Sequence, residues 1–246
     1  MKRQNKTLFI IPCCKAKAPG GQTPFSFSDP IQDLISQPPY RALLSARKLV
    51  LDKLRGDPKY VSGKYDKNSN IKDGPEFGTS RPVGEYLPAV ERYIGNLYKD
   101  KGSPGLANSI KTHIANPNKP SVLILSALYG PLHPSALIQD YNLKMSDRPA
   151  YQAWKRNFPP FLAEYVQRSS IKEVRLYLGG STHYLKVAKP AVRLLKEKKL
   201  VGRVIHYDVK NGSSSRTPLL HGRLALSHLE GRSDPDAEAG VVTTEL

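Results

Sequence analysis

The stretch of residues 120–145 constrains the fold of this chain more than any other. It opens with the apolar run VLIL at 122–125, which comes after a segment containing prolines and asparagines and predicts a buried strand. Two small residues come directly after the run, and Tyr129 and Gly130 follow after Leu128. Open α/β sheets place ligand sites where the chain leaves the carboxyl end of such a strand. We therefore expect a ligand site here; the alternative is a strand, a tight turn and a covering loop without a ligand.

Strand and helix patterns alternate along the rest of the chain. Apolar runs predict further strands at 8–11, 173–178 and 204–209. Periodic apolar positions predict helices at 40–54, 84–100, 149–166, 183–195 and 216–228. The pair Pro159-Pro160 is expected to break or kink its helix. The alternation predicts an α/β fold, a single domain over residues 1–228 with a central, mainly parallel sheet flanked by helices.

Two segments fall outside this pattern. Residues 56–84 are rich in glycine, proline, aspartate, lysine and asparagine, which predicts an irregular basic insertion. Its lysines and tyrosines, among them Lys64 and Tyr65, suit contact with a nucleic acid, and a solvated loop is the equally weighted alternative. Residues 229–246 are acidic and rich in small residues, which predicts a disordered tail.

The balance of charge favours a polyanionic partner. Lysine and arginine number 38 and aspartate and glutamate number 21, so the formal net charge is +17. Such a surplus favours nucleic acid through counterion release, and a basic surface without such a partner is the alternative. We predict double-stranded DNA as the partner. The predicted DNA contacts are Lys15, Lys17, Arg92, Lys144, Lys155, Arg156, Lys186, Lys189 and Arg193.

Sequence patterns also disfavour membranes, metals and nucleotide cofactors. No apolar run approaches the roughly 20 residues of a membrane-spanning helix and no signal peptide is recognisable, so we expect a cytoplasmic protein without a membrane partner. The two cysteines, Cys13 and Cys14, are adjacent, which disfavours a disulfide between them. The histidines lack metal-ligand spacing, and the Gly-Gly-Ser turn at 179–181 is not a phosphate-binding glycine motif. We therefore expect neither a metal nor a nucleotide cofactor.

Polar and aromatic residues gather where the predicted strands end. Asp140 and Asp208 are the candidate catalytic carboxylates, in that order. The residues predicted to hold a flat heterocycle are Ser126, Tyr129, Gly130, His133, Tyr141, Asn96, Ser181, His183 and Tyr184. Ser181 or Thr182 is the expected N-cap of the next helix, whose amino terminus favours anions. Because neighbouring parallel strands end at one edge of a sheet, we expect these groups to share a cavity.

Several motifs, in the same chain order, resemble the YaaA family of peroxide stress proteins. The run LSALYGPLHP with the LIQDY after it is similar to the family's L-S-G-L-Y-G-x-L-R-P and L-I-Q-P-Y. Four shorter stretches, LFIIPCCK, RYIGNLY, LGGSTHYLKVAKP and HYDVKNG, resemble further motifs of that family. The resemblance spans most of residues 8–225 and implies a YaaA-like α/β fold and a DNA-binding role in oxidative stress.

The chain also departs from the family pattern at two candidate positions. Asn96 stands where the family has an aspartate, and Asp140 stands where the family often has proline. Asp208 matches a family aspartate, although it could merely cap the turn before Asn211-Gly212.

The candidate groups suit chemistry on a base extruded from DNA. Aromatic faces and hydrogen-bonding groups read a flipped base, and a carboxylate can orient water while the N-glycosidic bond breaks. We therefore predict a DNA glycosylase, a hydrolase for a modified or damaged base, acting in repair or in defence against phage with modified DNA. The alternative is a non-catalytic DNA-binding stress protein, and exchange of a base in free nucleotides is a third hypothesis.

Overall fold

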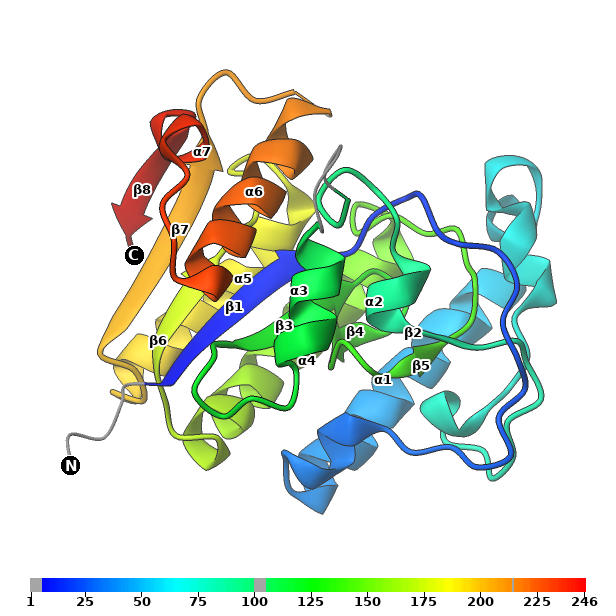
Figure 1. Cartoon of the computed structure of the whole chain (residues 1–246). Helices are drawn as coiled ribbons and strands as arrows, with labels where there is room; N and C mark the ends of the chain where they lie inside the picture. The colour runs from blue at the N-terminus through cyan, green and yellow to red at the C-terminus, as the bar shows by residue number, and fades with distance from the viewer. Residues whose placement is uncertain (1–5, 100–104, 214) are drawn as a thin grey trace.

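A six-stranded sheet forms the centre of the computed structural model, which describes residues 6–99, 105–213 and 215–246 (Figure 1). The strand order is β4-β3-β1-β6-β7-β8, and the inner four strands are parallel. The strands are β4 (Gly130–Leu132), β3 (Ser121–Ser126), β1 (Lys6–Pro12), β6 (Ile171–Leu176), β7 (Arg203–Val209) and β8 (Val241–Glu245). The edge strands β4 and β8 are antiparallel to their neighbours. The predicted α/β fold with a mainly parallel sheet is confirmed.

Helices cover both faces of the sheet, which explains the apolar runs of β1 and β3. On one face, α4 (Arg148–Arg168) packs between α1 (Gln37–Arg55) and α5 (His183–Glu197). On the other face, α3 (Leu106–His113) packs against α6 (Arg216–Glu230). In Figure 1, α3 and α6 lie in front of the sheet and α4 and α5 behind it. Strands buried on both faces read as continuous apolar runs rather than as alternating patterns.

The order of the strands reverses beside β1. The chain leaves β1 toward β3 on one side, whereas it leaves the adjacent β6 toward β7 on the other side. Such a reversal opens a crevice between the carboxyl ends of the two strands, where ligands of α/β proteins bind. The residues that come after β1 and β6 therefore flank the expected position of a site.

Helix α4 is continuous through Pro159 and Pro160, so the predicted break is wrong. The backbone carbonyl groups that lose their N–H partners belong to Lys155 and Arg156, which are exposed and can be hydrated. Packing against α1 and α5 stabilises the helix on its apolar side.

The helix predicted at 84–100 is also shorter than expected. The segment forms β2 (Leu87–Pro88), which pairs with β5 (Leu137–Ile138), and then the single turn α2 (Ala89–Arg92). Tyr93 continues in extended conformation as a bridge partner of Lys17. Tertiary pairing therefore overrides the local helical pattern.

The carboxyl-terminal segment is ordered, so the predicted disordered tail and the domain boundary at residue 228 are wrong. A short helix, α7 (Pro235–Ala239), buries Ala237 completely, and β8 then pairs with β7 from Val241 opposite Val209 onward. The prediction of disorder from composition was wrong because two valines and two threonines, whose side chains are β-branched, are enough to form an edge strand.

Residues 56–84 are irregular, as predicted, but they are held in place by specific contacts. They form the short 3-10 helices η2 (Pro58–Tyr60), η3 (Gly63–Asn70) and η4 (Pro75–Phe77), while η1 (Pro30–Asp33) precedes α1. The Asn68 side chain donates to the carbonyl oxygens of Tyr60 and Asn142 at 2.8 and 2.7 Å. The Tyr65 hydroxyl donates to Asp147 at 2.8 Å. The excursion therefore packs onto the stretch after β5.

Within the described part of the chain, the helices are all too short or too polar to span a bilayer.

Candidate functional site

A cavity of about 700 Å³ lies at the carboxyl edge of the sheet, where β1, β6 and β7 end. Its walls come from the loop after β1, the Gly-Gly-Ser-Thr turn after β6, the end of β7 and the start of α6. The polar residues among its lining are Lys15, Asn96, Ser181, Thr182, Tyr184, Asp208, Ser213, Thr217 and His221. The volume lies in the range of about 300–1,000 Å³ that is typical of small-molecule sites.

The turn after β6 holds the carboxylate of Asp208. The backbone N–H of Gly180 donates to Oδ1 of Asp208 at 2.8 Å, and that of Val209 donates to the same oxygen at 2.9 Å. A side chain at position 180 would collide with this carboxylate, so glycine is required there. Oδ2 accepts no hydrogen bond from the described residues. Asp208 therefore offers a fixed, half-buried carboxylate with one oxygen available to a ligand or water.

Thr182 is the N-cap of α5 and shapes the same turn. Its hydroxyl donates to the carbonyl of Gly179 at 2.7 Å and accepts from the N–H of Leu185 at 3.4 Å. Ser181, the other candidate for the cap, is exposed and lines the cavity. The N-terminus of α5 therefore borders the cavity, and a helix N-terminus favours anions.

The loop after β1 separates this cavity from a second one of about 410 Å³. The two cavities share Cys13, Cys14, Lys15, Thr182 and Tyr184 in their walls. The second cavity is strongly basic, because the side chains that line it include Lys15, Lys17, Lys64 and Lys144. Lys15 and Lys144 come from loops far apart in the sequence, and the basic excursion at 56–84 supplies Lys64.

The two cysteines between the cavities are engaged rather than free to react. The Cys13 sulfur lies 3.0 Å from the hydroxyl of Tyr184. The Cys14 thiol donates to the carbonyl of Ala16 at 3.0 Å and accepts from the N–H of Gly95 at 3.2 Å. Burial raises the pKa of Cys14 to about 11. Cys14 therefore remains a thiol at neutral pH.

Several residues predicted for the base pocket are instead part of the core. Ser126, Tyr129 and Tyr141 are fully buried. Tyr129 stacks on Phe77 and accepts a hydrogen bond from the backbone N–H of Gln139. Tyr141 lies 2.9 Å from the hydroxyl of Ser126 in a buried network. These aromatic faces are covered by protein, so their assignment as stacking platforms is wrong.

Gly130 belongs to the same core region. Its φ is +66°, and a side chain there would collide with the indole ring of Trp154. The glycine thus permits a tight turn beneath α4 and lines neither of the two cavities at the carboxyl edge.

Asp140 does not line either cavity at the carboxyl edge. Its Oδ2 forms a salt bridge with Lys67 at 2.6 Å, and its Oδ1 is buried without a hydrogen-bond partner among the described residues. This carboxylate ties the 56–84 excursion to the central stretch. Asp208, the second candidate from the sequence, is therefore the better placed of the two carboxylates.

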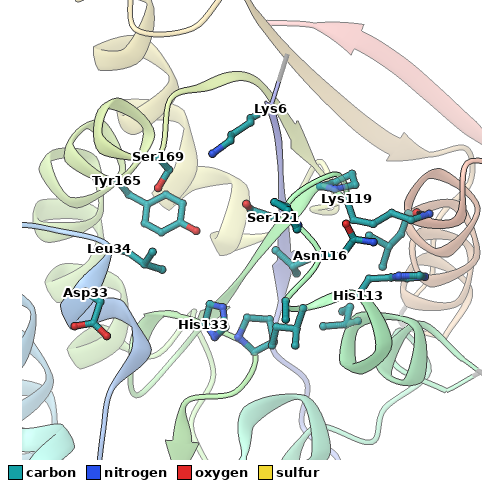
Figure 2. Close-up of a pocket in the computed structure, with 18 of the residues that line it drawn as sticks. Lys6, Asp33, Leu34, His113, Asn116, Lys119, Ser121, His133, Tyr165 and Ser169 are labelled. Carbon is teal, nitrogen blue, oxygen red and sulfur yellow. Dashed lines mark hydrogen bonds between the residues drawn. The ribbon is translucent and has the colours of Figure 1, made fainter. Parts of the chain in front are cut away.

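His133 lies at the opposite edge of the sheet. It faces a separate cavity of about 410 Å³ whose wall includes the residues that begin β1 and β3, Lys6 and Ser121 (Figure 2). Burial lowers the pKa of His133, and its Nδ1 lies 2.8 Å from the hydroxyl of Ser135. The amino and carboxyl edges of a parallel sheet are separated by the length of its strands, so His133 cannot share a site with Asp208.

The predicted DNA contacts divide into exposed and buried groups. Lys186, Lys189 and Arg193 are exposed on α5, and Lys155 and Arg156 are exposed on α4. Lys15 and Lys144 are exposed at the second cavity, whereas Lys17 lines it but is only 8% exposed.

Arg92 is fully buried and cannot reach DNA. Its guanidinium donates to the backbone carbonyls of Ala18, Glu85 and Ile138. Its assignment as a DNA contact is therefore wrong: it is a structural cross-link between three segments.

The remaining predicted residues lie around the two cavities. Asn96 is exposed at the 700 Å³ cavity, His183 lines the second cavity, and Tyr184 lies between them. Sequence reasoning missed Thr217 and His221, which line the larger cavity from α6. The turn Asn211-Gly212 before that helix could have predicted their position, because after this turn α6 runs back over the end of β7.

Comparison with protein families gives one match over most of the chain. The family model described as peroxide stress protein YaaA matches residues 8–218. This range contains all the residues that line the two cavities except His221, and it reaches every strand of the sheet except β8. A search of curated proteins found no match.

Proposed function

This chain belongs to the peroxide stress protein YaaA family, and we propose that it binds double-stranded DNA and excises a modified or damaged base by hydrolysing the N-glycosidic bond. The observation that carries this proposal is the fixed carboxylate of Asp208 in the wall of the 700 Å³ cavity. A carboxylate held beside a cavity at a strand-order reversal is suited to activate a water or to stabilise developing positive charge.

Binding to DNA is supported by the charge that surrounds the site. The net charge of +17 favours a polyanion, and the second cavity collects lysines beside the first one. In the proposed complex, Lys15, Lys64 and Lys144 contact phosphates on either side of the extruded nucleotide. Exposed basic residues on α5 extend this surface.

Cleavage of the glycosidic bond requires a positioned water and donors for the departing base. We assign orientation of the water to Oδ2 of Asp208, because Oδ1 is already occupied by two backbone N–H groups. The amide of Asn96 and the hydroxyl of Ser181 line the same cavity and can donate to or accept from base edges. Tyr184, between the cavities, is the aromatic residue best placed to contact the base.

One observation favours a second candidate, a non-catalytic DNA-binding stress protein. The aromatic rings of Tyr129 and Tyr141, which would stack on a base, are buried in the core. Excising enzymes usually read a flipped base between aromatic faces, so a site with fewer of them suits simple binding of the DNA backbone.

The deciding experiment measures strand breaks at abasic sites. The full chain is incubated with duplexes that carry modified, damaged or ordinary bases, and the products are heated in alkali and separated. Base excision gives breaks at the altered position only, whereas a non-catalytic protein gives none. Binding measured in parallel should weaken steeply with salt, with a slope of about −0.9 per phosphate neutralised, and a flat salt profile would remove DNA as the partner.

A further inference from the structure

The amine of Lys17 is a reactive group that has no role in the proposed hydrolysis by Asp208. Lys17 lines the second cavity, yet its side chain is only 8% exposed. Its Nζ lies 4.0 Å from the centre of the Tyr141 ring and 5.8 Å from that of Tyr93. We propose that Lys17 is a nucleophile that forms an imine with the aldehyde of an abasic deoxyribose and thereby cleaves the DNA strand. This inference rests on the proposed function for its substrate.

The hydrogen bonds of Lys17 suit a neutral amine. Its Nζ donates to the backbone carbonyl oxygens of Cys14 and Lys15, at 3.1 and 3.4 Å. These two acceptors match the two N–H bonds of a neutral amine, whereas the third N–H of an ammonium would face the ring of Tyr141 rather than an oxygen acceptor. It forms no salt bridge with a described carboxylate, since the nearby Asp140 is paired with Lys67.

The charges around Lys17 act in both directions, and burial dominates. Desolvation lowers the pKa of Lys17, and the positive charge of Lys67 lowers it further. The carboxylate of Asp140 opposes this shift, and thiolates at Cys13 or Cys14 would oppose it too. A lysine with a lowered pKa keeps more of its amine neutral near pH 7, which is how enzymes activate lysines that attack carbonyl groups. The neighbouring Lys15 is exposed and lacks this environment.

The reaction balances without a further reagent. Hydrolysis of the glycosidic bond leaves a sugar whose ring-opened form carries an aldehyde at C1′. Nζ of Lys17 attacks this carbon, a C–N bond forms, and the carbonyl oxygen leaves as water to give a protonated imine. Loss of a proton from C2′ to solvent then drives β-elimination: the C3′–O bond breaks and its electron pair leaves with the phosphate. Hydrolysis of the imine releases Lys17.

The test uses a duplex with a single abasic site generated beforehand from deoxyuridine, so that base excision by this protein is not required. The full chain and the duplex are mixed with sodium borohydride, which reduces an imine to a stable amine, and the adduct is mapped by mass spectrometry of tryptic peptides. We expect a borohydride-dependent covalent complex with the sugar remnant on Lys17. No complex, or a remnant on another lysine, would overturn the inference while leaving excision by Asp208 open to its own assay.

Matched variants give a second readout. Lys17→Arg keeps a long basic side chain but lacks a nucleophilic amine, and trapping should fall to background while DNA affinity is retained. Lys53→Arg, exposed on α1, should trap as the wild type does. Thermal unfolding checks that Lys17→Arg folds; if it does not, the mapped wild-type adduct decides. Trapping by the wild type should also persist to a pH well below 10.5, the ordinary pKa of lysine.

Discussion

The backbone N–H of Gly180 donates to the carboxylate of Asp208 at 2.8 Å, across 28 residues of chain. This bond joins the turn after β6 to the end of β7, and both strands deliver their residues to one cavity. The absence of a side chain at position 180 is what allows the approach. The geometry of the candidate site therefore depends on both the glycine and the aspartate.

Asp208→Asn should abolish or strongly reduce base excision while leaving DNA affinity within a few-fold. The asparagine oxygen can still accept from Gly180 and Val209, so the fold is retained and only the charge is lost. A group that acts mainly in the transition state affects turnover more than binding. Excision and equilibrium binding are measured on the same preparation. His133→Gln, at the opposite edge of the sheet, is the control and should behave as the wild type; full excision by Asp208→Asn would rule out this carboxylate.

Gly180→Ala should lower both stability and excision. The new methyl group meets the Asp208 carboxylate, so the turn or the aspartate must move, at a cost of roughly 1–3 kcal/mol in the free energy of unfolding. Gly202→Ala is the matched control, because the nearest atom to its new methyl group would be a carbonyl oxygen at an ordinary 3.7 Å. Urea unfolding of the two variants measures the difference, and equal stabilities would contradict the proposed close approach.

Deletion of residues 231–246 should destabilise the protein. The deletion removes buried Ala237 and uncovers the backbone of β7 along its whole pairing with β8. A loss of about 1 kcal/mol lowers the Tm by roughly 2–4 °C in a chain of this size, and we expect a larger decrease than that. Differential scanning calorimetry measures the change. Val242→Thr, a substitution at an exposed position of β8, should leave the Tm nearly unchanged; an unchanged Tm after deletion would mean that β8 contributes nothing.

Stability should decrease below about pH 6.5 through His221. Burial lowers the pKa of His221 from 6.5 to about 4, and its Nε2 donates to the carbonyl of Tyr207 at 2.9 Å. The unfolded chain therefore binds a proton that the folded chain excludes. Stability is full above pH 6.5 and falls between pH 6.5 and 4, by at most about 1.4 kcal/mol per pH unit.

His221→Gln isolates this contribution, because an amide can still donate to Tyr207 but does not titrate. Urea unfolding at pH 7, 6 and 5 should show a smaller pH dependence for the variant than for the wild type. An identical dependence would assign the effect to other groups, such as His228, whose pKa burial also lowers to about 4.

Local apolar patterns and the ends of strands are the features of this fold that the sequence predicts well. Short stretches of sequence are enough to predict the parallel strands, the turn at Gly179-Gly180 and the N-cap position beside it. The structure confirms these predictions. Asp208 is recognisable as a candidate because it lies near the end of a strand. The sequence could not rank it above Asp140, because that order depends on Lys67, a residue 73 positions earlier, which pairs with Asp140.

The errors have a common physical origin in long-range packing. Tyr129 and Tyr141 belong to segments that end at the correct edge, but Phe77 and the hydroxyl network around Ser126 cover their rings. Arg92 is basic, yet carbonyl groups from distant segments surround it. Whether a polar or aromatic side chain is exposed depends on what packs over it, and no local window contains that information.

The pairing of β8 with β7 has a practical consequence for measurements on this protein. β8 runs antiparallel to β7, so the chain returns to the amino edge of the sheet, where the N–H of Leu246 donates to the carbonyl of Val204 at 2.9 Å. The described chain also begins at that edge, with Lys6 of β1, as Figure 1 shows. A fluorophore or an immobilising tether attached after Leu246 would therefore sit on the side opposite the Asp208 cavity and leave it open to solution.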